Sequence, residues 1–115
     1  MSQDSFGAFV RRERERRGIT LRDMAKRIGV SPTYQSKVER DEFPPPAEDK
    51  VRKIAEIIEC NADELLALAG RVAAELTEII KRQPHEFAVL LRTTKGFSAQ
   101  RIERLIGEAK KVKDR

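Results

Sequence analysis

The sequence predicts an all-α protein, and three observations lead to that prediction. Apolar residues recur at the three- and four-residue spacing of amphipathic helices along almost the whole chain. The strict alternation of apolar and polar residues that indicates a strand does not occur. Glycine, proline and capping residues fall between the periodic segments, at the positions where helices start and stop.

Size and composition agree with a small helical protein. The chain has 115 residues, of which 37% are charged and 5% aromatic, and it contains no Trp. Its core therefore has to be aliphatic, which suits helix packing. At this length we expect one domain, or one small domain with an extension.

The sequence also bears on the cellular compartment. No apolar stretch approaches the ~20 residues of a membrane span. The N-terminus has no basic segment followed by an apolar one, which argues against secretion. The single Cys60 cannot form an internal disulfide, as expected in a reducing cytosol. We therefore expect a cytoplasmic protein of a bacterial-type cytosol that does not bind a membrane.

The first periodic segment, residues 6–17, predicts a helix. Phe6, Phe9 and Val10 form its apolar stripe. Gly18 follows where a C-terminal cap belongs. We interpret the run of arginines and glutamates in this segment as a mostly solvated face, with one or two arginines reaching phosphate.

The most informative segment spans residues 20–39 and predicts two short helices joined at a glycine. Thr20 and Asp23 have the spacing of a capping box, so a helix should begin directly after Thr20. Gly29 follows where the chain must turn with positive φ, which glycine does at little steric cost. Ser31 can then cap the second helix. This order of signals is typical of a helix-turn-helix that reads DNA.

Two further helices are predicted before Gly70. Three consecutive prolines, residues 44–46, hold the preceding loop in an extended course. A helix over about residues 47–59 follows. Another begins after Asn61, which has Glu64 three residues on as a cap partner.

At these residues the chain resembles the lambda-repressor/Cro-type helix-turn-helix regulators, also called the xenobiotic-response-element (XRE) family. The resemblance extends roughly over residues 5–70. It implies a five-helix lambda-repressor-like DNA-binding domain at residues 1–70. The apolar periodicity after Gly70 predicts a short helical C-terminal extension. The matching positions are Ala25, Gly29, Val30, Val38 and the segments 31–34, 36–40, 42–46 and 62–66.

The resemblance implies that the second helix of the motif lies in the major groove, with residues at its start and one turn later facing base edges. Here these residues are Pro32, Thr33, Ser36 and Lys37. Lys37 can donate to guanine O6 or N7, and the Thr33 methyl group can pack on a thymine methyl group. Pro32 cannot form a hydrogen bond to a base through its side chain, so fewer bases should be read directly than in relatives with an amide side chain at this position. The alternative is that these residues are only solvated.

Four further residues are candidates for phosphate contacts: Thr20, Arg22, Tyr34 and Arg40. Exposed backbone amides at the start of the first motif helix can also meet phosphate. Thr20 should serve mainly as a cap. For Arg22 and Arg40, a direct phosphate contact and a purely solvent-exposed position are equally expected.

Several positions depart from the family pattern or have a competing interpretation. Gln35 stands where the family usually has an apolar residue, and a buried amide must find partners or cost roughly 1–3 kcal/mol. It therefore either finds partners in the core or tilts outward towards DNA or solvent. Ala47 and Glu59 replace a capping Ser and a helix-ending Gly, at a modest cost in stability. Cys60 should be a small buried hydrophobe, and His85, with no second His or Cys nearby, a surface residue.

Charge changes sign along the chain. Residues 1–40 carry ten Lys and Arg against five Asp and Glu, residues 41–70 carry three against eight, and residues 71–115 carry eleven against six. The change within the first seventy residues suggests one basic face and one acidic face. Because phosphate contacts release counter-ions, the basic face should dock on DNA.

Residues 71–115 are expected to form a helical dimerisation or partner-binding segment. Pro84 opens a helix, Gly96 interrupts the chain and Ser98 can cap a last helix. The apolar stripes are more than three short helices can hide among themselves, so we expect a second copy to cover them. The alternatives are that these helices fold back on residues 1–70 or bind another protein. The expected interface residues are Leu76, Ile79, Ile80, Phe87, Leu90, Leu91, Ile102, Leu105 and Ile106.

We interpret the chain as a sequence-specific DNA-binding transcriptional regulator, expected to be a nucleoid-associated repressor that binds a palindromic operator in double-stranded DNA as a homodimer. The sequence has no Ser/His/Asp or Cys/His set, glycine-rich phosphate loop or metal-ligand spacing. We therefore expect no enzyme activity, no cofactor and no metal. Two alternatives stay open. One is an antitoxin that binds its own operator and neutralises a toxin through the C-terminal helices. The other is a protein–protein adaptor without specific DNA binding.

Overall fold

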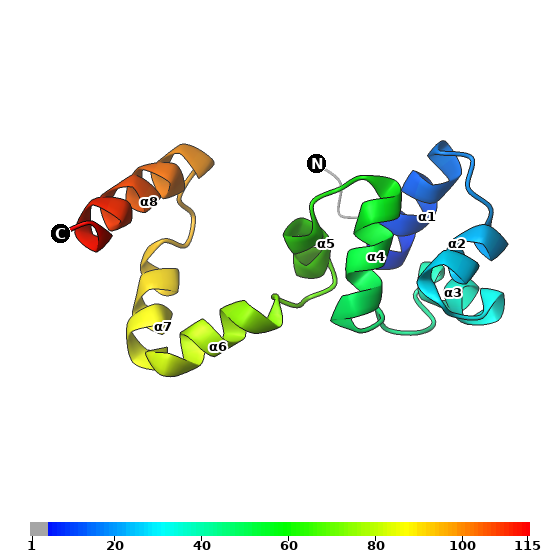
Figure 1. Ribbon diagram of the computed structural model, residues 1–115, viewed down its shortest axis with the longest axis horizontal. Coiled ribbons are helices and arrows are strands. Elements are labelled where there is room, and N and C mark those ends of the chain that lie inside the picture. The colour runs from blue at the N-terminus through cyan, green and yellow to red at the C-terminus, as the bar shows by residue number, and fades with distance from the viewer. Residues whose placement is uncertain (1–4) are drawn as a thin grey trace. The chain divides into compact units, whose positions relative to one another are not determined.

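In the computed structural model, which describes residues 5–115, the chain is helical throughout (Figure 1). Within this range there are eight α-helices and no strand, which confirms the predicted all-α class. The chain forms two compact units, of which the first ends at Ala74 and the second comprises Glu75–Arg115. Residues 1–4 of the expected first domain lie outside the described residues.

The first unit contains the helix-turn-helix segment. Its α4 packs against α1, α2 and α5, while α3 packs against α1 and α2. The helices are α1 (Phe6–Arg16), α2 (Leu21–Ile28), α3 (Pro32–Glu39), α4 (Glu48–Ile58) and α5 (Ala62–Leu68).

Local signals set where these helices begin and end. The side chains of Thr20, Ser31 and Asn61 each accept a hydrogen bond of 3.0 Å from the backbone N–H three residues further on. Such caps satisfy amides that have no partner inside the helix. Gly18 and Gly29 adopt positive φ values of 68° and 77°, the left-handed conformation expected at both turns. The predicted caps and turns are confirmed at these positions.

The core of the first unit is almost entirely aliphatic, as the composition predicts. Twelve buried side chains from α1 to α5 and the segment after α5 form one cluster, with a single aromatic ring among them. They are Phe6, Val10, Met24, Ile28, Val38, Val51, Ile54, Ala55, Ile58, Leu65, Leu66 and Ala73.

Gly7 allows the start of α1 to approach the end of α3. A Cβ atom at Gly7 would lie 2.3 Å from the carbonyl oxygen of Val38 and 2.7 Å from that of Glu39. These are backbone atoms of a packed helix and cannot move aside cheaply. The close crossing of α1 and α3 therefore requires a residue without a side chain.

The two residues that depart from the family pattern at the ends of α4, together with Cys60 and His85, lie largely as expected. Ala47 precedes α4 without a side-chain cap bond. Glu59 follows α4 in the left-handed conformation with φ 58°, which is unfavourable for a residue with a side chain. Cys60 is half-buried and packs against the core, and burial raises the pKa of its thiol. His85 is exposed, as predicted.

Arg71 holds the proline loop, residues 44–46, in place before α4. The guanidinium group of Arg71 donates to the carbonyl oxygen of Pro45 at 2.7 Å and to that of Pro46. Proline carbonyls are free to accept here because the extended loop makes no helical bonds. The loop between α3 and α4 is therefore held by the segment that follows α5.

The first unit continues past Gly70, its predicted end, to Ala74. Ala73 joins the core and is only 1% exposed. The backbone N–H of Ala74 donates to the Glu48 carboxylate at 2.9 Å. This bond, together with one from Arg52, holds the pKa of the Glu48 carboxyl below its ordinary value. The segment after α5 is thus part of the first unit and not of the second.

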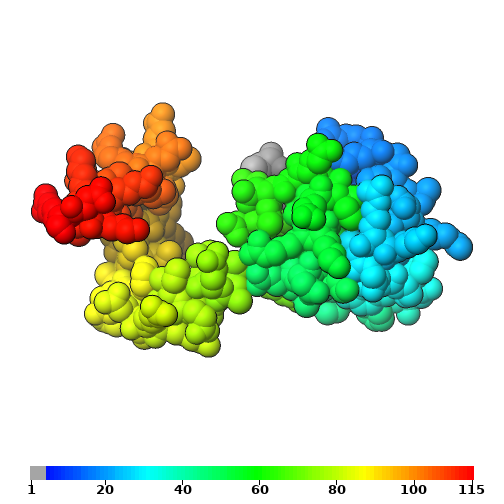
Figure 2. Space-filling model, in the orientation of Figure 1, coloured from blue at the N-terminus to red at the C-terminus, as the bar shows by residue number. Residues whose placement is uncertain are grey.

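The second unit contains α6, which begins at the boundary (Ala74–Arg82), α7 (Pro84–Thr93) and α8 (Ala99–Lys113). None of these helices contains a buried residue. No two of them pack extensively against each other. Ser98 caps α8 by accepting from the Arg101 N–H at 3.2 Å, as predicted. Figure 2 shows α8, coloured orange to red, open on the face in view.

The apolar stripes of the second unit are therefore uncovered. Among the residues expected at a dimer interface, Ile80, Phe87 and Ile102 are half-buried. The other six are exposed: Leu76, Ile79, Leu90, Leu91, Leu105 and Ile106. In the described part of the chain, no helix has the length and apolarity that crossing a membrane requires.

Candidate nucleic-acid interface

Helix α3 has one buried face and one open face. Gln35, Val38 and Glu39 are buried against the rest of the first unit. The four residues predicted to meet base edges lie off that face: Pro32 and Thr33 are exposed, and Ser36 and Lys37 are half-buried. Pro32 and Thr33 occupy the start of the helix and the other two lie one turn later, as the resemblance implies.

The Lys37 ammonium group lies close to an aromatic ring, that of Phe43, which was not among the predicted contact residues. Its Nζ atom lies 5.1 Å from the centroid of the Phe43 ring, within the range of a cation–π interaction. The Phe43 ring in turn lies 5.7 Å from the ring of Tyr34, tilted by 46°. Phe43 was not expected here because it lies in the loop after α3 and belongs to no helical stripe.

The residues predicted to contact phosphate differ in their surroundings. Thr20 is exposed, but its Oγ1 atom is used by the cap of α2. Arg22 is exposed and has no ion pair within the described residues. Arg40 is exposed and pairs with Glu42 at 3.1 Å. Tyr34 is half-buried against the core, so it can offer only part of its surface.

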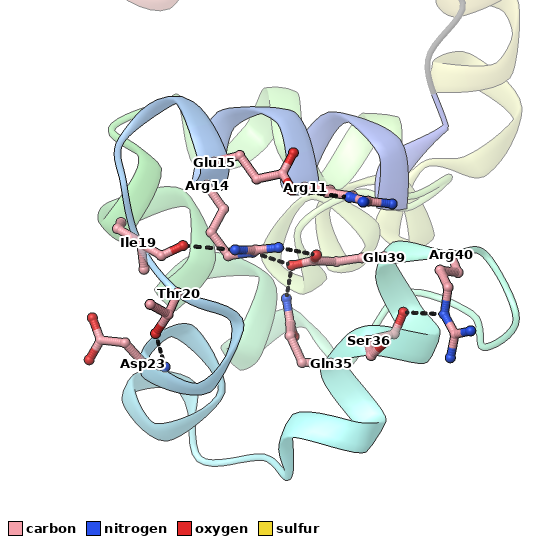
Figure 3. Close-up of polar contacts among 10 residues, drawn as sticks. All are labelled: Arg11, Arg14, Glu15, Ile19, Thr20, Asp23, Gln35, Ser36, Glu39 and Arg40. Atoms are coloured by element: carbon pink, nitrogen blue, oxygen red, sulfur yellow. Dashed lines mark hydrogen bonds and ion pairs between the residues drawn. The ribbon is translucent and has the colours of Figure 1, made fainter.

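A buried polar network fixes α3 to α1 (Figure 3). The Arg14 guanidinium group donates twice to the Glu39 carboxylate, with both distances 2.9 Å. Its third bond goes to the Ile19 carbonyl oxygen at 2.7 Å. The bonds to Glu39 raise the pKa of Arg14 above its ordinary value. The Arg14 side chain thus links three elements: its own helix α1, the turn that precedes α2, and helix α3.

The network corrects part of the interpretation of α1. Arg11, Arg12 and Arg16 are exposed, as a solvated face requires, but Arg14 is buried. The sequence held a signal, because position 14 follows two core residues of α1 at intervals of four. The alternating positive and negative charges of residues 11–17 concealed this signal.

Gln35 is buried and does not tilt outward. Its Nε2 atom donates to the Glu39 carboxylate at 2.9 Å. Its Oε1 atom is buried and accepts no hydrogen bond from any residue in the described range 5–115. Gln35 therefore lies in the core, the first of the two outcomes that the sequence left open, but only the N–H side of its amide has a partner.

An open polar cleft of about 300 Å³ lies beside this network. Its charged groups largely satisfy one another, since Arg11 pairs with Glu15 at 3.3 Å and Arg14 with Glu39. No group of His, Cys, Asp and Glu that could hold a metal ion occurs among residues 5–115. The lining residues of the cleft are Arg11, Arg14, Glu15, Leu21, Ser36, Glu39 and Arg40.

A sequence profile described as a helix-turn-helix domain matches residues 5–68, more than half of the chain. The chain belongs to this helix-turn-helix family. The resemblance drawn from residues 20–39 is therefore confirmed. The matched range ends with the last residue of α5 and does not include α6, α7 or α8.

Two curated relatives carry names that agree with this family. Over 64 residues the chain is 38% identical to the uncharacterized HTH-type transcriptional regulators Rv0474 and MT0491 from two strains of Mycobacterium tuberculosis. The match covers 56% of this chain and 45% of each relative, so it spans less than half of their length. The N-terminal DNA-binding domain of SinR from Bacillus subtilis is 24% identical, with a TM-score of 0.48, over 53% of this chain and 88% of that domain.

Proposed function

We propose that this chain is a sequence-specific DNA-binding transcriptional regulator that inserts α3 into the major groove. The observation that carries the proposal is the division of α3 into two faces. Gln35, Val38 and Glu39 anchor it, and the opposite side presents Thr33 and Lys37 to the outside. A recognition helix needs one face packed against its own domain and an opposite, polar face that is accessible to DNA.

The open face carries groups that match base edges. The Lys37 ammonium group would donate to guanine O6 or N7, and Ser36 can serve as donor or acceptor. The Thr33 methyl group would pack on a thymine methyl group. Pro32 would add an apolar contact but no hydrogen bond, so few base pairs in each half-site should be read directly.

Phosphate contacts would come from cations on either side of α3. Arg22 is exposed and has no ion pair within residues 5–115, so it can meet phosphate without first leaving a carboxylate. Arg40 would have to exchange Glu42 for phosphate. An exposed ion pair contributes only about 0–1 kcal/mol, so this exchange costs little.

The second unit would hold two copies together as a homodimer. Nine of its large apolar side chains are between 36% and 67% exposed. At roughly 200 Å² for a whole side chain, this exposure amounts to on the order of 800 Å², close to the area that each partner buries in a standard interface. Burying this area against a second copy would give the second unit the core that it lacks.

A symmetric dimer would present two α3 helices to one face of DNA. Half-sites about 34 Å apart would then be read together, which favours a palindromic operator. We propose that the protein acts as a repressor by occupying such an operator. The paired contacts would supply the affinity that one small domain lacks.

Selection from random DNA duplexes by the purified full chain tests this function. We expect an enriched palindrome with two half-sites one helical turn apart, and a dimer at tens of micromolar by light scattering. Duplexes bound without sequence preference would contradict DNA recognition and favour an adaptor. A full-length monomer would contradict the homodimer. A stoichiometric small protein co-purifying through α6–α8 would favour the antitoxin.

A further inference from the structure

Phe43 is a large apolar side chain at the edge of the candidate interface. It is 40% exposed and lies in the loop that follows α3. Its ring contacts two predicted DNA-contact residues, with Lys37 Nζ at 5.1 Å from the ring centroid and the Tyr34 ring at 5.7 Å. The ring therefore lies between a base-reading candidate and a residue packed against the core.

The backbone around Phe43 is fixed to the end of α3. The Lys37 carbonyl oxygen accepts from the N–H of Glu42 at 2.8 Å and from that of Phe43 at 3.2 Å. Asp41 has a positive φ of 62° and donates from its N–H to the Val38 carbonyl oxygen at 3.1 Å. The loop thus folds back onto the helix that carries Lys37.

The far side of Phe43 is held as well. Three consecutive prolines follow it and restrict the chain to an extended course. Arg71 donates to the carbonyl oxygens of the second and third of these prolines. Because it is held on both sides, the Phe43 ring has a defined position relative to Lys37.

A lysine side chain has a flexible four-carbon stem and can reach phosphates as easily as base edges. An aromatic face attracts an ammonium group through its quadrupole and so favours the rotamers that place the group over the ring. A lysine restricted in this way reaches fewer positions along the groove. Restriction of this kind contributes specificity by reducing binding to wrong sequences.

We propose that Phe43 is a specificity-determining positioning residue: its ring, in tilted contact with the Tyr34 ring, holds the Lys37 ammonium group so that it reads one base pair in each half-site. The inference rests on the proposed function, because it requires α3 to read DNA. It adds that the loop after α3 sets the selectivity of that reading. Phe43 acts here through Lys37 and not by a base contact of its own.

The test compares Phe43→Leu with the wild-type full chain in DNA selection and in titrations of single-base-pair operator variants. Lys37→Ala first identifies the base pair that Lys37 reads. Phe43→Leu keeps the apolar bulk but removes the ring, so it should lower the preference at that same base pair by about 2- to 5-fold. Phe43→Tyr keeps the ring and should restore the preference.

Two controls separate positioning from stability. Leu68→Ala changes an apolar residue on α5 that is also 40% exposed, and it should leave every base preference unchanged. The double variant of Lys37→Ala and Phe43→Leu should be no less selective than Lys37→Ala alone, since the ring acts through the lysine. Thermal unfolding of each variant shows that the fold is kept.

The outcomes of the two proposals can be told apart. If the wild-type chain selects no sequence, the proposed function fails. If the wild-type chain selects an operator and Phe43→Leu keeps its full preference at the Lys37 base pair, the positioning role is overturned. An equal loss of affinity for operator and random DNA also overturns it, because that result describes a structural residue or a phosphate contact.

Discussion

Helix α2 in the first unit and α6 in the second are of nearly equal length and carry apolar stripes of the same kind. Met24, Ala25 and Ile28 of α2 are completely buried. Leu76 and Ile79 of α6 are 38% and 46% exposed, and α6 has no buried residue. The stripe predicts that a helix has an apolar face, but the core it joins must be supplied by other elements.

Two glycines within helices show the same contrast. Gly7 in α1 is packed so tightly that a Cβ atom would lie 2.3 Å from the Val38 carbonyl oxygen. Within residues 5–115, and apart from its chain neighbours and the backbone of α8 itself, no atom lies within 4 Å of a Cβ atom added at Gly107. The first unit is constrained by its own packing, whereas the second leaves most of its large apolar side chains exposed.

Truncation after Ala74 should leave a folded monomer that binds the operator about 10²- to 10⁴-fold more weakly, because paired binding is lost. Light scattering and titration with the selected operator measure the two effects. Truncation after Gly70 is the matched control. It also removes Arg71 and the buried Ala73, so it should melt at a lower temperature. A fragment ending at Ala74 that still dimerises would contradict the role of the second unit.

Arg14→Met should lower the free energy of unfolding of the first unit by about 3–5 kcal/mol, because it leaves the Glu39 carboxylate buried without its cation. Urea unfolding gives the value. Arg11→Met breaks the exposed pair with Glu15 on the same helix and should cost less than about 1 kcal/mol. Equal costs for the two variants would show that burial of the Arg14 pair adds nothing.

Gly7→Ala should lower the free energy of unfolding by about 2–3 kcal/mol, because the methyl group meets backbone carbonyls. Gly107→Ala lies in open space with ordinary helical φ and should stabilise α8 by about 0.5–1 kcal/mol. Denaturant unfolding and helicity by circular dichroism report the two changes. Opposite signs are required, and destabilisation by both would mean that the second unit is already tightly packed.

Lys37→Ala should weaken operator binding by about 1–3 kcal/mol and relax the preference at one base pair in each half-site. Its half-buried position on the open face of α3 is the reason. Titration against operator and random duplexes distinguishes the alternatives. Equal losses on both would make Lys37 a phosphate contact.

Gln35→Leu should raise the free energy of unfolding by about 0.5–1 kcal/mol, because it removes the buried Oε1 atom that accepts no bond. The Glu39 carboxylate loses one donor but keeps two from Arg14. Thermal and urea unfolding measure the change. A lower melting temperature would show that the bond from Gln35 to Glu39 outweighs the unpaired oxygen.

Much of the first unit could be predicted because its signals are short in range. A cap such as that of Thr20 joins atoms three residues apart, and the turn at Gly29 depends on one φ value. The pairing of Arg14 with Glu39 could not be predicted in the same way, since it joins residues separated by 25 positions. Neither charge pattern nor spacing specifies which buried groups will meet.

The helical class, the caps, the turn of the helix-turn-helix and the family can be deduced from the residues alone, because each depends on neighbouring residues or on their order. The burial of Gln35, the contact of Phe43 with Lys37 and the extension of the first unit to Ala74 are visible only in the folded chain. These features depend on how helices cross and where a loop returns. Such geometry results from the simultaneous packing of the whole unit, and no single segment encodes it.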